Sequence, residues 1–293
     1  MSHSGMRKRT AIRWGMIGIA ALFIAVFSYW PTIQAFILSF QTGKGVNLKF
    51  SGGANYARLF SDKIFFTTVK NTLTYAVFAI PILIFLAMVF AVILNDPRLT
   101  GRGVYRTCIF LPCVTSMVSY SILFKYLFST NGIVNNILSA MHLVDKPIQF
   151  IQDPVWAKVV IIVALIWRYT GYYMIFFLSA LQNIDPCVYE AAQLDGATSA
   201  QTFRKITMPL LRPVIFLTSI MSLNSILQLF DEVKNLTDGG PGDATRTISE
   251  YIYDLSFKFV PTYGYAATVS FAVFVLVVTI TVIQKAVMRS KDE

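Results

Sequence analysis

The chain has 293 residues, of which 55% are hydrophobic and 14% are charged, and its mean hydropathy is +0.60. Soluble domains carry about 25% charged residues, so this composition excludes an ordinary soluble protein and indicates an integral membrane protein. The net charge of +10 would favour nucleic-acid binding in a soluble protein, but here the basic residues cluster at the ends of apolar segments, as membrane orientation signals do.

Six segments are long and apolar enough to cross a bilayer, which needs about 20 helical residues. They are Trp14–Phe40, Thr67–Leu94, Val104–Phe128, Val155–Leu181, Met208–Phe230 and Tyr263–Met288. The sequence therefore predicts an all-α polytopic membrane protein with six transmembrane helices. The first segment is too long for the apolar core of a signal peptide, about 7–15 residues, so we expect it to be retained as the first span.

Basic residues between the predicted spans predict the orientation of the chain. They lie before span one (Arg7, Lys8, Arg9, Arg13), after span two (Arg98, Arg102, Arg106), before span five (Arg204, Lys205, Arg212) and at the end (Lys285, Arg289, Lys291). With six spans these four regions share one side, which places both termini and residues 182–207 in the cytoplasm. The outer connections, Gln41–Phe66, Ser129–Pro154 and Asp231–Thr262, are long enough to form a contact surface.

The cysteines and histidines give no sign of a metal or redox centre. Cys108, Cys113 and Cys187 form no CxxC pair, and the two histidines are His3 and His142. We therefore expect no cofactor on this chain.

A polar, alanine-rich insert of residues 185–209 separates spans four and five. Asp185-Pro186 is a good helix start, and the helix is predicted to run from Cys187 to about Leu194. Gly196 ends it, because glycine takes backbone angles that other residues avoid. Thr198-x-x-Gln201 is a capping box that starts a second short helix, and Pro209 marks the bend into span five.

The composition of this insert favours docking against another protein. Its first half is acidic and has small side chains, whereas a helix lying on lipid headgroups is usually basic with large apolar residues. Alanines let another backbone approach closely, and Glu190 offers a charge for pairing with a cation. An amphipathic loop on the membrane surface is the alternative.

Polar and aromatic residues in spans four and five are candidates for a solute pathway. Span four carries Trp167, Arg168, Tyr169, Tyr172 and Tyr173, and span five carries Ser222, Asn224, Ser225 and Gln228. Aromatic faces with hydroxyl and amide groups suit a sugar, but such groups also join transmembrane helices to each other. An arginine within the membrane must face a cavity or a partner, so Arg168 is expected to bind an anionic substrate, pair with a carboxylate or bond to carbonyls.

The connection 231–262 holds six acidic residues and the turn Asp238-Gly239-Gly240-Pro241. From these residues we expect a turn within a solvated outer loop.

Two motifs together resemble a known family. Glu190-Ala-Ala-x-x-Asp195-Gly196-Ala197, followed by Ile206-x-x-Pro209, is similar to the EAA motif of permease subunits in binding-protein-dependent ABC importers. Leu236-Thr-Asp-Gly-Gly-Pro241, followed by Thr245-x-Thr247 and Tyr251-x-Tyr253, resembles the outer loop of MalF-like carbohydrate permeases. The resemblance covers Thr67 to the C-terminus. It implies a first region, 1–66, and a permease core, 67–293.

The resemblance also implies roles for particular residues. A coupling helix held by an ATPase would be formed by Glu190, Ala191, Ala192, Asp195, Gly196 and Ala197. The resemblance favours Tyr169, Tyr172, Ser222 and Ser225 as the lining of the sugar path, for which Trp167, Arg168, Asn224 and Gln228 are further candidates. A binding protein would face Gly239, Gly240 and Pro241.

The implied partners are a second homologous permease in a heterodimer, an ATPase dimer that holds ATP and Mg, an extracytoplasmic solute-binding protein and membrane lipid, with no nucleic acid. The implied place is the cytoplasmic membrane of a prokaryote, and the implied cargo is a carbohydrate, with oligosaccharides favoured.

Three other functions remain to be weighed. A glycerol-3-phosphate type of ABC permease would use Arg168. A gradient-driven secondary transporter needs titratable groups deep in the membrane, and the predicted spans hold no Asp, Glu or His near their centres. A membrane-embedded enzyme needs an acid–base or metal cluster that the sequence lacks. The chain also lacks the G-x-x-x-x-G-K-[ST] phosphate loop, so the motor itself must be another chain.

Overall fold

The computed structural model describes residues 3–45, 47–258 and 260–289, and the side chains that it describes lie between residues 14 and 286 of these ranges. The basic residues Arg7, Lys8, Arg9, Arg13, Arg289 and Lys291, used above to predict the orientation, lie outside the described side chains.

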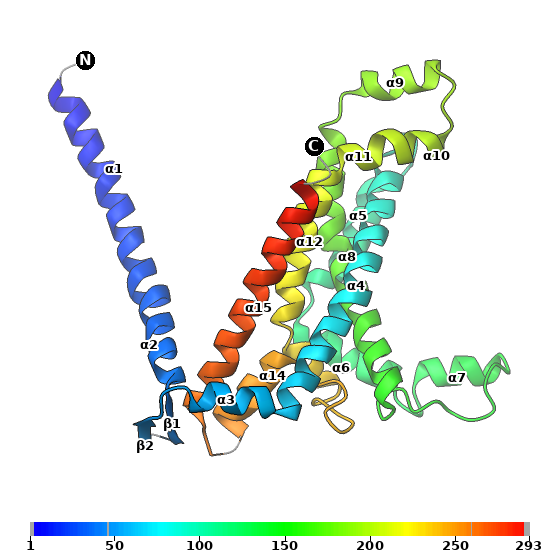
Figure 1. Ribbon diagram of the computed structural model, residues 1–293. Helices are drawn as coiled ribbons and strands as arrows, with labels where there is room; N and C mark the ends of the chain where they lie inside the picture. Colours follow the sequence, from blue (N-terminus) through cyan, green and yellow to red (C-terminus); the bar gives the residue numbers. More distant parts are fainter. Residues whose placement is uncertain (1–2, 46, 259, 290–293) are drawn as a thin grey trace. The chain divides into compact units, whose positions relative to one another are not determined.

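The chain is built mainly of helices, which Figure 1 labels in chain order. They are α1 (His3–Ile24), α2 (Trp30–Ser39), α3 (Ala54–Ser61), α4 (Lys63–Asn95), α5 (Arg102–Val114), α6 (Met117–Leu127), α7 (Ile133–Ala140), α8 (Pro154–Gln182), α9 (Pro186–Leu194), α10 (Ser199–Thr202), α11 (Met208–Leu210), α12 (Arg212–Leu227), α13 (Asp231–Leu236), α14 (Ile248–Tyr253) and α15 (Tyr263–Arg289). Short π-helical segments occupy Ala25–Tyr29, Phe203–Thr207 and Asp254–Lys258.

Four helical stretches are long and apolar enough to cross a membrane: Trp14–Ser39, Lys63–Asn95, Pro154–Gln182 and Tyr263–Ala286. Two bent pairs, α5 with α6 and α10–α11 with α12, bring the number of candidate spans in the described residues to six if each pair is one span. The prediction of one continuous helix over Val104–Phe128 is wrong, because α5 and α6 meet at an angle of 97°.

The structure divides into two compact units, of which the first contains the described residues of Met1–Asp62 and Ile252–Val275. Its small antiparallel sheet pairs β1 (Gln41–Lys44) with β2 (Asn47–Phe50), which corrects the all-α prediction at this point. The buried Asn55 side chain donates hydrogen bonds to the carbonyls of Ser39 and Gln41, at 2.9 and 2.8 Å. These bonds fix the turn from α2 into the sheet.

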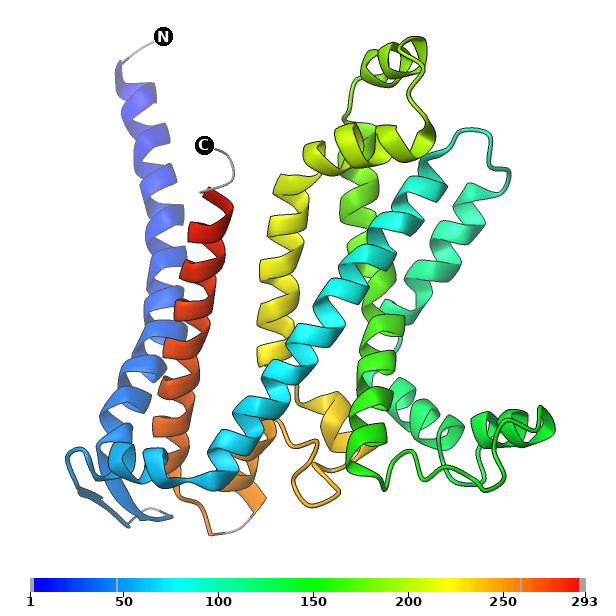
Figure 2. The ribbon, with the colours of Figure 1, turned by 45° about the vertical axis from the view of Figure 1, so that its right-hand side comes forward.

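The second unit, Lys63–Tyr251 with Leu276 onward, contains the longest helix pair, α4 and α8. These helices lie side by side in Figures 1 and 2. Small side chains line their contact, and Ala79, Ala87, Ala157 and Ala164 are fully buried. Because small residues let transmembrane backbones approach closely, this alanine pattern explains why α4 and α8 form the centre of the unit.

The ends of α8 carry different structures. In Figure 2 the insert with α9 and α10 lies at one end of α8, and α6 and α7 lie near the other. Within this unit, residues 182–207 and the connection Ser129–Pro154 therefore lie at opposite ends of α8.

Helix α5 crosses α8 at Gly171. A Cβ atom added at Gly171 would lie 2.0 Å from the Ile109 carbonyl oxygen, so only glycine permits this approach of the two backbones. Three residues before Gly171, on the same side of α8, Arg168 reaches the point where α5 ends.

The break between α5 and α6 has a local cause. Pro112 cannot donate a backbone hydrogen bond, and Thr115 and Ser116 have extended backbones, with ψ of 149° and 136°. The Thr115 carbonyl then accepts a hydrogen bond from the Arg168 guanidinium at 2.7 Å. Of the three roles weighed for Arg168, bonding to a carbonyl is the one that the structure records.

We predict that Gly171→Ala destabilises the protein. The added methyl group meets backbone atoms of α5, and overpacking of this kind costs about 1–3 kcal/mol or more. Thermal unfolding of the purified protein in detergent should show a lower midpoint for Gly171→Ala. The matched control is Gly103→Ala, where an added Cβ meets nothing within 4 Å. Equal midpoints for the two variants would contradict this account of the crossing.

Candidate functional site

The insert between α8 and α12 begins with a capped helix. The Asp185 carboxylate accepts a hydrogen bond from the Cys187 amide at 2.9 Å, and Pro186 occupies the first turn of α9. The same hydrogen bond lowers the pKa of Asp185. The helix start and the end at Leu194 are confirmed as predicted.

Gly196 ends α9 as the sequence predicts. Its φ is +74°, in the left-handed region, where glycine has no steric cost. The Ala197 amide donates to the Ala192 carbonyl at 2.9 Å, and the Gly196 amide donates to the Gln193 carbonyl at 3.0 Å. This is the Schellman pattern of helix ends, so the turn after α9 is set by backbone hydrogen bonds.

The second half of the insert begins with the predicted capping box. The Thr198 hydroxyl accepts from the Gln201 amide at 3.3 Å, and the Gln201 side chain accepts from the Thr198 amide at 2.8 Å. The chain then runs through α11 and bends by 65° into α12, beside the buried Leu211. Pro209 lies two residues before this bend.

One face of α9 is held by the chain itself and the other is open. Ala192 is buried, and the Tyr189 hydroxyl lies 3.3 Å from the Thr207 hydroxyl. Glu190 and Ala191 are exposed, and Leu194 is 90% exposed. The exposed carboxylate of Glu190 and the exposed side chain of Leu194 therefore lie together on the open face of α9.

A cavity of about 240 Å³ lies between α8, α12 and α13. Five pathway candidates line it: Tyr169 and Tyr173 from α8, Ser222 and Ser225 from α12, and Gln228 directly after α12. The spacing of Ser222 and Ser225, nearly one helical turn, places both on the same side of α12. The structure therefore brings together the tyrosine and hydroxyl groups that the sequence analysis chose for a sugar.

Other predicted pathway residues lie elsewhere. Trp167 packs against the rings of Tyr120 and Phe124, at centroid distances of 6.3 and 5.4 Å, and lines an apolar groove that contains Pro112. Tyr172 packs edge-on against the Tyr173 ring at 5.2 Å.

Asn224, a partly buried residue of α12, and Tyr172 are not among the residues that line the cavity.

Arg168 is part of the wall behind the cavity. It is 5% exposed, and its guanidinium lies over the Tyr120 ring at 4.6 Å and near the Tyr169 ring at 5.6 Å. Cation–π contacts of this kind stabilise a buried charge. The hydrogen bond to the Thr115 carbonyl holds the Arg168 guanidinium near the Tyr169 ring.

Glu232 is a cavity residue that the sequence analysis missed. Its carboxyl accepts a hydrogen bond from the Tyr169 hydroxyl at 3.2 Å, and its side chain is 3% exposed. The sequence signal was weak, because Glu232 lies two residues after Phe230, the end of the predicted span, and looks like the first part of a solvated loop. Asp231, beside it, also lines the cavity.

The expectation of a solvated outer loop is therefore corrected. Glu232 is 3% exposed and Glu250 is fully buried, while Asp254, in the first unit, is 6% exposed. The physical reason is that α13 packs against α6, so the segment folds back into the protein.

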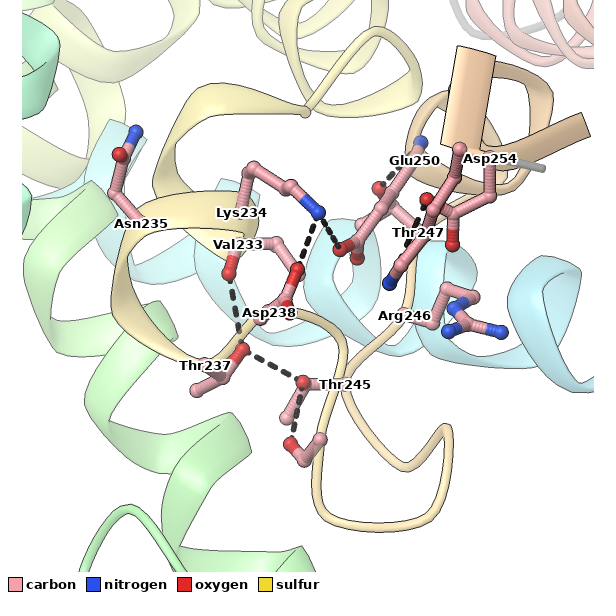
Figure 3. A network of polar contacts seen from close by, with 12 residues as sticks. Val233, Lys234, Asn235, Thr237, Asp238, Thr245, Arg246, Thr247, Glu250 and Asp254 are labelled. Atoms are coloured by element: carbon pink, nitrogen blue, oxygen red, sulfur yellow. Dashed lines mark hydrogen bonds and ion pairs between the residues drawn. The ribbon is translucent and has the colours of Figure 1, made fainter. Parts of the chain in front are cut away.

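A polar network holds the Gly-Gly-Pro turn (Figure 3). Lys234 pairs with Asp238 and lies 3.9 Å from the Glu250 carboxylate. The Thr245 hydroxyl donates to the Gly240 carbonyl at 2.7 Å and contacts the Thr237 hydroxyl at 2.8 Å.

Gly239 within this turn has a φ of +75°, and an added Cβ would lie 3.0 Å from a Glu250 oxygen. Gly240 and Pro241 are joined by a cis peptide bond and are both partly exposed. Hydrogen bonds within the protein therefore hold the turn, and Gly240 and Pro241 are partly exposed in it.

A family model described as "Binding-protein-dependent transport system inner membrane component" matches residues 57–292. The lactose transport system permease protein LacF of Rhizobium radiobacter is 47% identical over 280 residues, which cover 95% of this chain and 94% of that protein. The trehalose/maltose transport system permease protein MalF of Thermococcus litoralis is 32% identical over 248 residues, covering 83% and 81% of the two chains.

A solved structure has the same fold. A chain from the crystal structure of a bacterial ABC transporter that imports the acidic polysaccharide alginate superposes with a TM-score of 0.83 at 28% identity. The superposition covers 97% of this chain and 96% of that chain. These matches confirm the family that the motif at Glu190–Ala197 indicates, and the chain belongs to the inner membrane components of binding-protein-dependent transport systems.

Proposed function

We propose that this chain is a permease subunit through which an ABC importer moves an oligosaccharide across the cytoplasmic membrane. Three relatives support a sugar, since they are named as permeases for lactose, arabinooligosaccharides and trehalose/maltose. The observation that carries the proposal is the cavity where Tyr169, Ser222, Ser225 and Gln228 meet, because these groups match the hydroxyls and apolar ring faces of a sugar.

Energy for transport comes, in this proposal, from a separate ATPase dimer that holds ATP and Mg. The open face of α9, with Glu190 and Leu194, is the docking surface for that ATPase. Both ends of α9 are fixed by hydrogen bonds, at Asp185 and at Gly196, so a force on the helix reaches α8 and α12 with little local deformation. The coupling set is Glu190, Ala191, Ala192, Asp195, Gly196 and Ala197.

The remaining partners follow from the same proposal. A second permease completes a heterodimer, and an extracytoplasmic solute-binding protein docks on Gly239, Gly240 and Pro241. The solved alginate transporter complex with its periplasmic protein supports a partner of this kind. Both termini are then cytoplasmic in a multi-pass prokaryotic protein, with residues 67–293 as the permease core and 1–66 as an added first region.

A glycerol-3-phosphate type of permease is less well supported. Arg168 was its candidate phosphate ligand, but the guanidinium donates to the Thr115 carbonyl and does not line the cavity. A gradient-driven transporter would need Glu232 or another buried acid to carry a proton across the membrane. Uptake by reconstituted vesicles distinguishes these cases, because uptake in the absence of the ATPase subunit would overturn the ABC proposal.

We predict that Glu190→Lys uncouples the transporter. In the proposal, Glu190 faces a basic residue of the ATPase, so the lysine would place two positive charges opposite each other. Loss of an interfacial charge pair costs about 2–5 kcal/mol. Substrate-stimulated ATPase activity of the purified complex should fall roughly tenfold or more, with partial assembly retained. Asp145→Lys is the control, since Asp145 is exposed in the connection after α7 and makes the same charge change. Unchanged stimulation in Glu190→Lys would remove Glu190 from coupling.

We predict that Ser222→Ala/Ser225→Ala slows sugar uptake. Each hydroxyl that bonds substrate contributes about 0.5–1.5 kcal/mol, so the pair should lower the initial rate of lactose uptake into proteoliposomes about five- to tenfold at subsaturating sugar. The exposed Ser139→Ala on α7 is the matched control. If the double variant and the control transport lactose equally fast, these hydroxyls are helix contacts and not pathway groups.

A further inference from the structure

The charges that line the cavity are all of one sign. Among its lining residues, the two that carry ionisable acidic or basic side chains, tyrosines aside, are Asp231 and Glu232, and both are acidic. The rest of the lining is apolar or neutral, including Leu83, Leu165 and Ile226. A cleft with low-dielectric walls and one sign of charge concentrates the electric field and repels ions of the same sign.

Glu232 is held so that its charge acts on the cavity. It is 3% exposed, so bulk water does little to screen it. Its hydrogen bond from the Tyr169 hydroxyl fixes the carboxyl beside a ring that also lines the cavity. A carboxylate has about four acceptor sites, so the bond from Tyr169 does not exhaust the capacity of Glu232 to accept hydrogen bonds.

Two basic side chains on the packed elements make their recorded contacts away from the cavity. Arg168 on α8 donates to the Thr115 carbonyl and lies over the Tyr120 ring. Lys234 on α13 pairs with Asp238 and Glu250. Neither basic side chain lines the cavity.

We propose that Glu232, together with Asp231, makes this cavity select against anionic solutes, so that its occupant is an uncharged sugar or an amino sugar. The inference rests on the proposed function, because it assigns a charge class to the same carbohydrate pathway. Glu232 is then a specificity-determining residue, and acidic sugars and sugar phosphates are excluded by charge repulsion.

Charged thiol reagents test the sign of the field directly in the purified complex with its partner subunits. Cys108, Cys113 and Cys187 are replaced by serine, and one reporter is introduced, either Ser225→Cys in the cavity or the exposed Ser139→Cys on α7. The rate constants for a trimethylammonium methanethiosulfonate and for a sulfonate methanethiosulfonate are measured from the intact mass of this chain. Their ratio at one thiol cancels differences in the thiol's own reactivity.

The cation-to-anion ratio at Ser225→Cys should exceed that at Ser139→Cys by about tenfold or more, because two carboxylates act at short range in a weakly screened site. Glu232→Gln should lower the ratio at Ser225→Cys about threefold, while Glu232→Asp should keep it. Asp145→Asn, which makes the same charge change on the outer connection, should leave it unchanged. If Glu232→Gln does not assemble, Asp231→Asn provides the same measurement with the same expected direction.

Equal cation-to-anion ratios at the two reporters, in chains that keep Asp231 and Glu232, would overturn the proposal. A high ratio that neither Glu232→Gln nor Asp231→Asn reduces would also overturn it, since the field would then have another source. The labelling needs no transport, so a high, Glu232-dependent ratio with no lactose uptake would sink the proposed sugar function and leave the charge selection standing.

Discussion

The hydrogen bond from Arg168 to the Thr115 carbonyl is the interaction on which the core of the second unit depends. Backbone carbonyls within a bilayer must be satisfied inside the protein, and a bend of 97° between α5 and α6 leaves the Thr115 carbonyl without a helical partner. A guanidinium supplies the missing donor, and the rings of Tyr120 and Tyr169 cover its charge. Gly171 makes this possible because it lets α5 lie against α8 close enough for the arginine to reach.

This arrangement connects the break to the cavity. Because α6 turns away from the line of α5, it can pack against α13, and α13 carries Glu232 to the wall of the cavity. Tyr169 takes part in both places: its ring lies near Arg168, and its hydroxyl donates to Glu232. Arg168, for which three roles were left open, is thus a structural support that bonds to a carbonyl, and the acid Glu232, which the sequence placed in solvent, lines the cavity.

Local signals in the sequence were sufficient for the insert. The Asp185 cap, the glycine end at Gly196 and the box at Thr198 depend on residues within a few positions of each other, and all three are present as predicted. The chemistry of capping is short-range, so a single sequence contains what is needed. The same holds for the alternation of apolar and basic segments from which the candidate spans were chosen.

Features that depend on contacts between distant residues could not be predicted in this way. Hydropathy places Val104–Phe128 in one apolar segment. It does not show that the helix breaks after Pro112, because the Thr115 carbonyl at the break is satisfied by Arg168, which lies 53 positions away in the sequence. In the same way Glu232, which follows an apolar run, reads as solvent-exposed until α13 is seen to pack against α6. Of the five residues named in α8 for the pathway, Tyr169 and Tyr173 line the cavity and Arg168 lies behind Tyr169, whereas Trp167 and Tyr172 do not line it. A mid-membrane position in the sequence does not show which face of a helix meets the cavity.

The fold of this chain does not by itself determine which solutes are accepted. The backbone of this chain superposes on that of a chain from a transporter of the acidic polysaccharide alginate, at 28% identity and a TM-score of 0.83. A shared backbone cannot by itself choose between acidic and neutral cargo, so the choice must be made by side chains that line the path. In this protein Arg168 donates to the carbonyl at the backbone break, and the charged side chains that line the cavity are carboxyls. On the proposed pathway, the use of Arg168 to hold the bent span therefore leaves Asp231 and Glu232 as the charged side chains at the cavity wall.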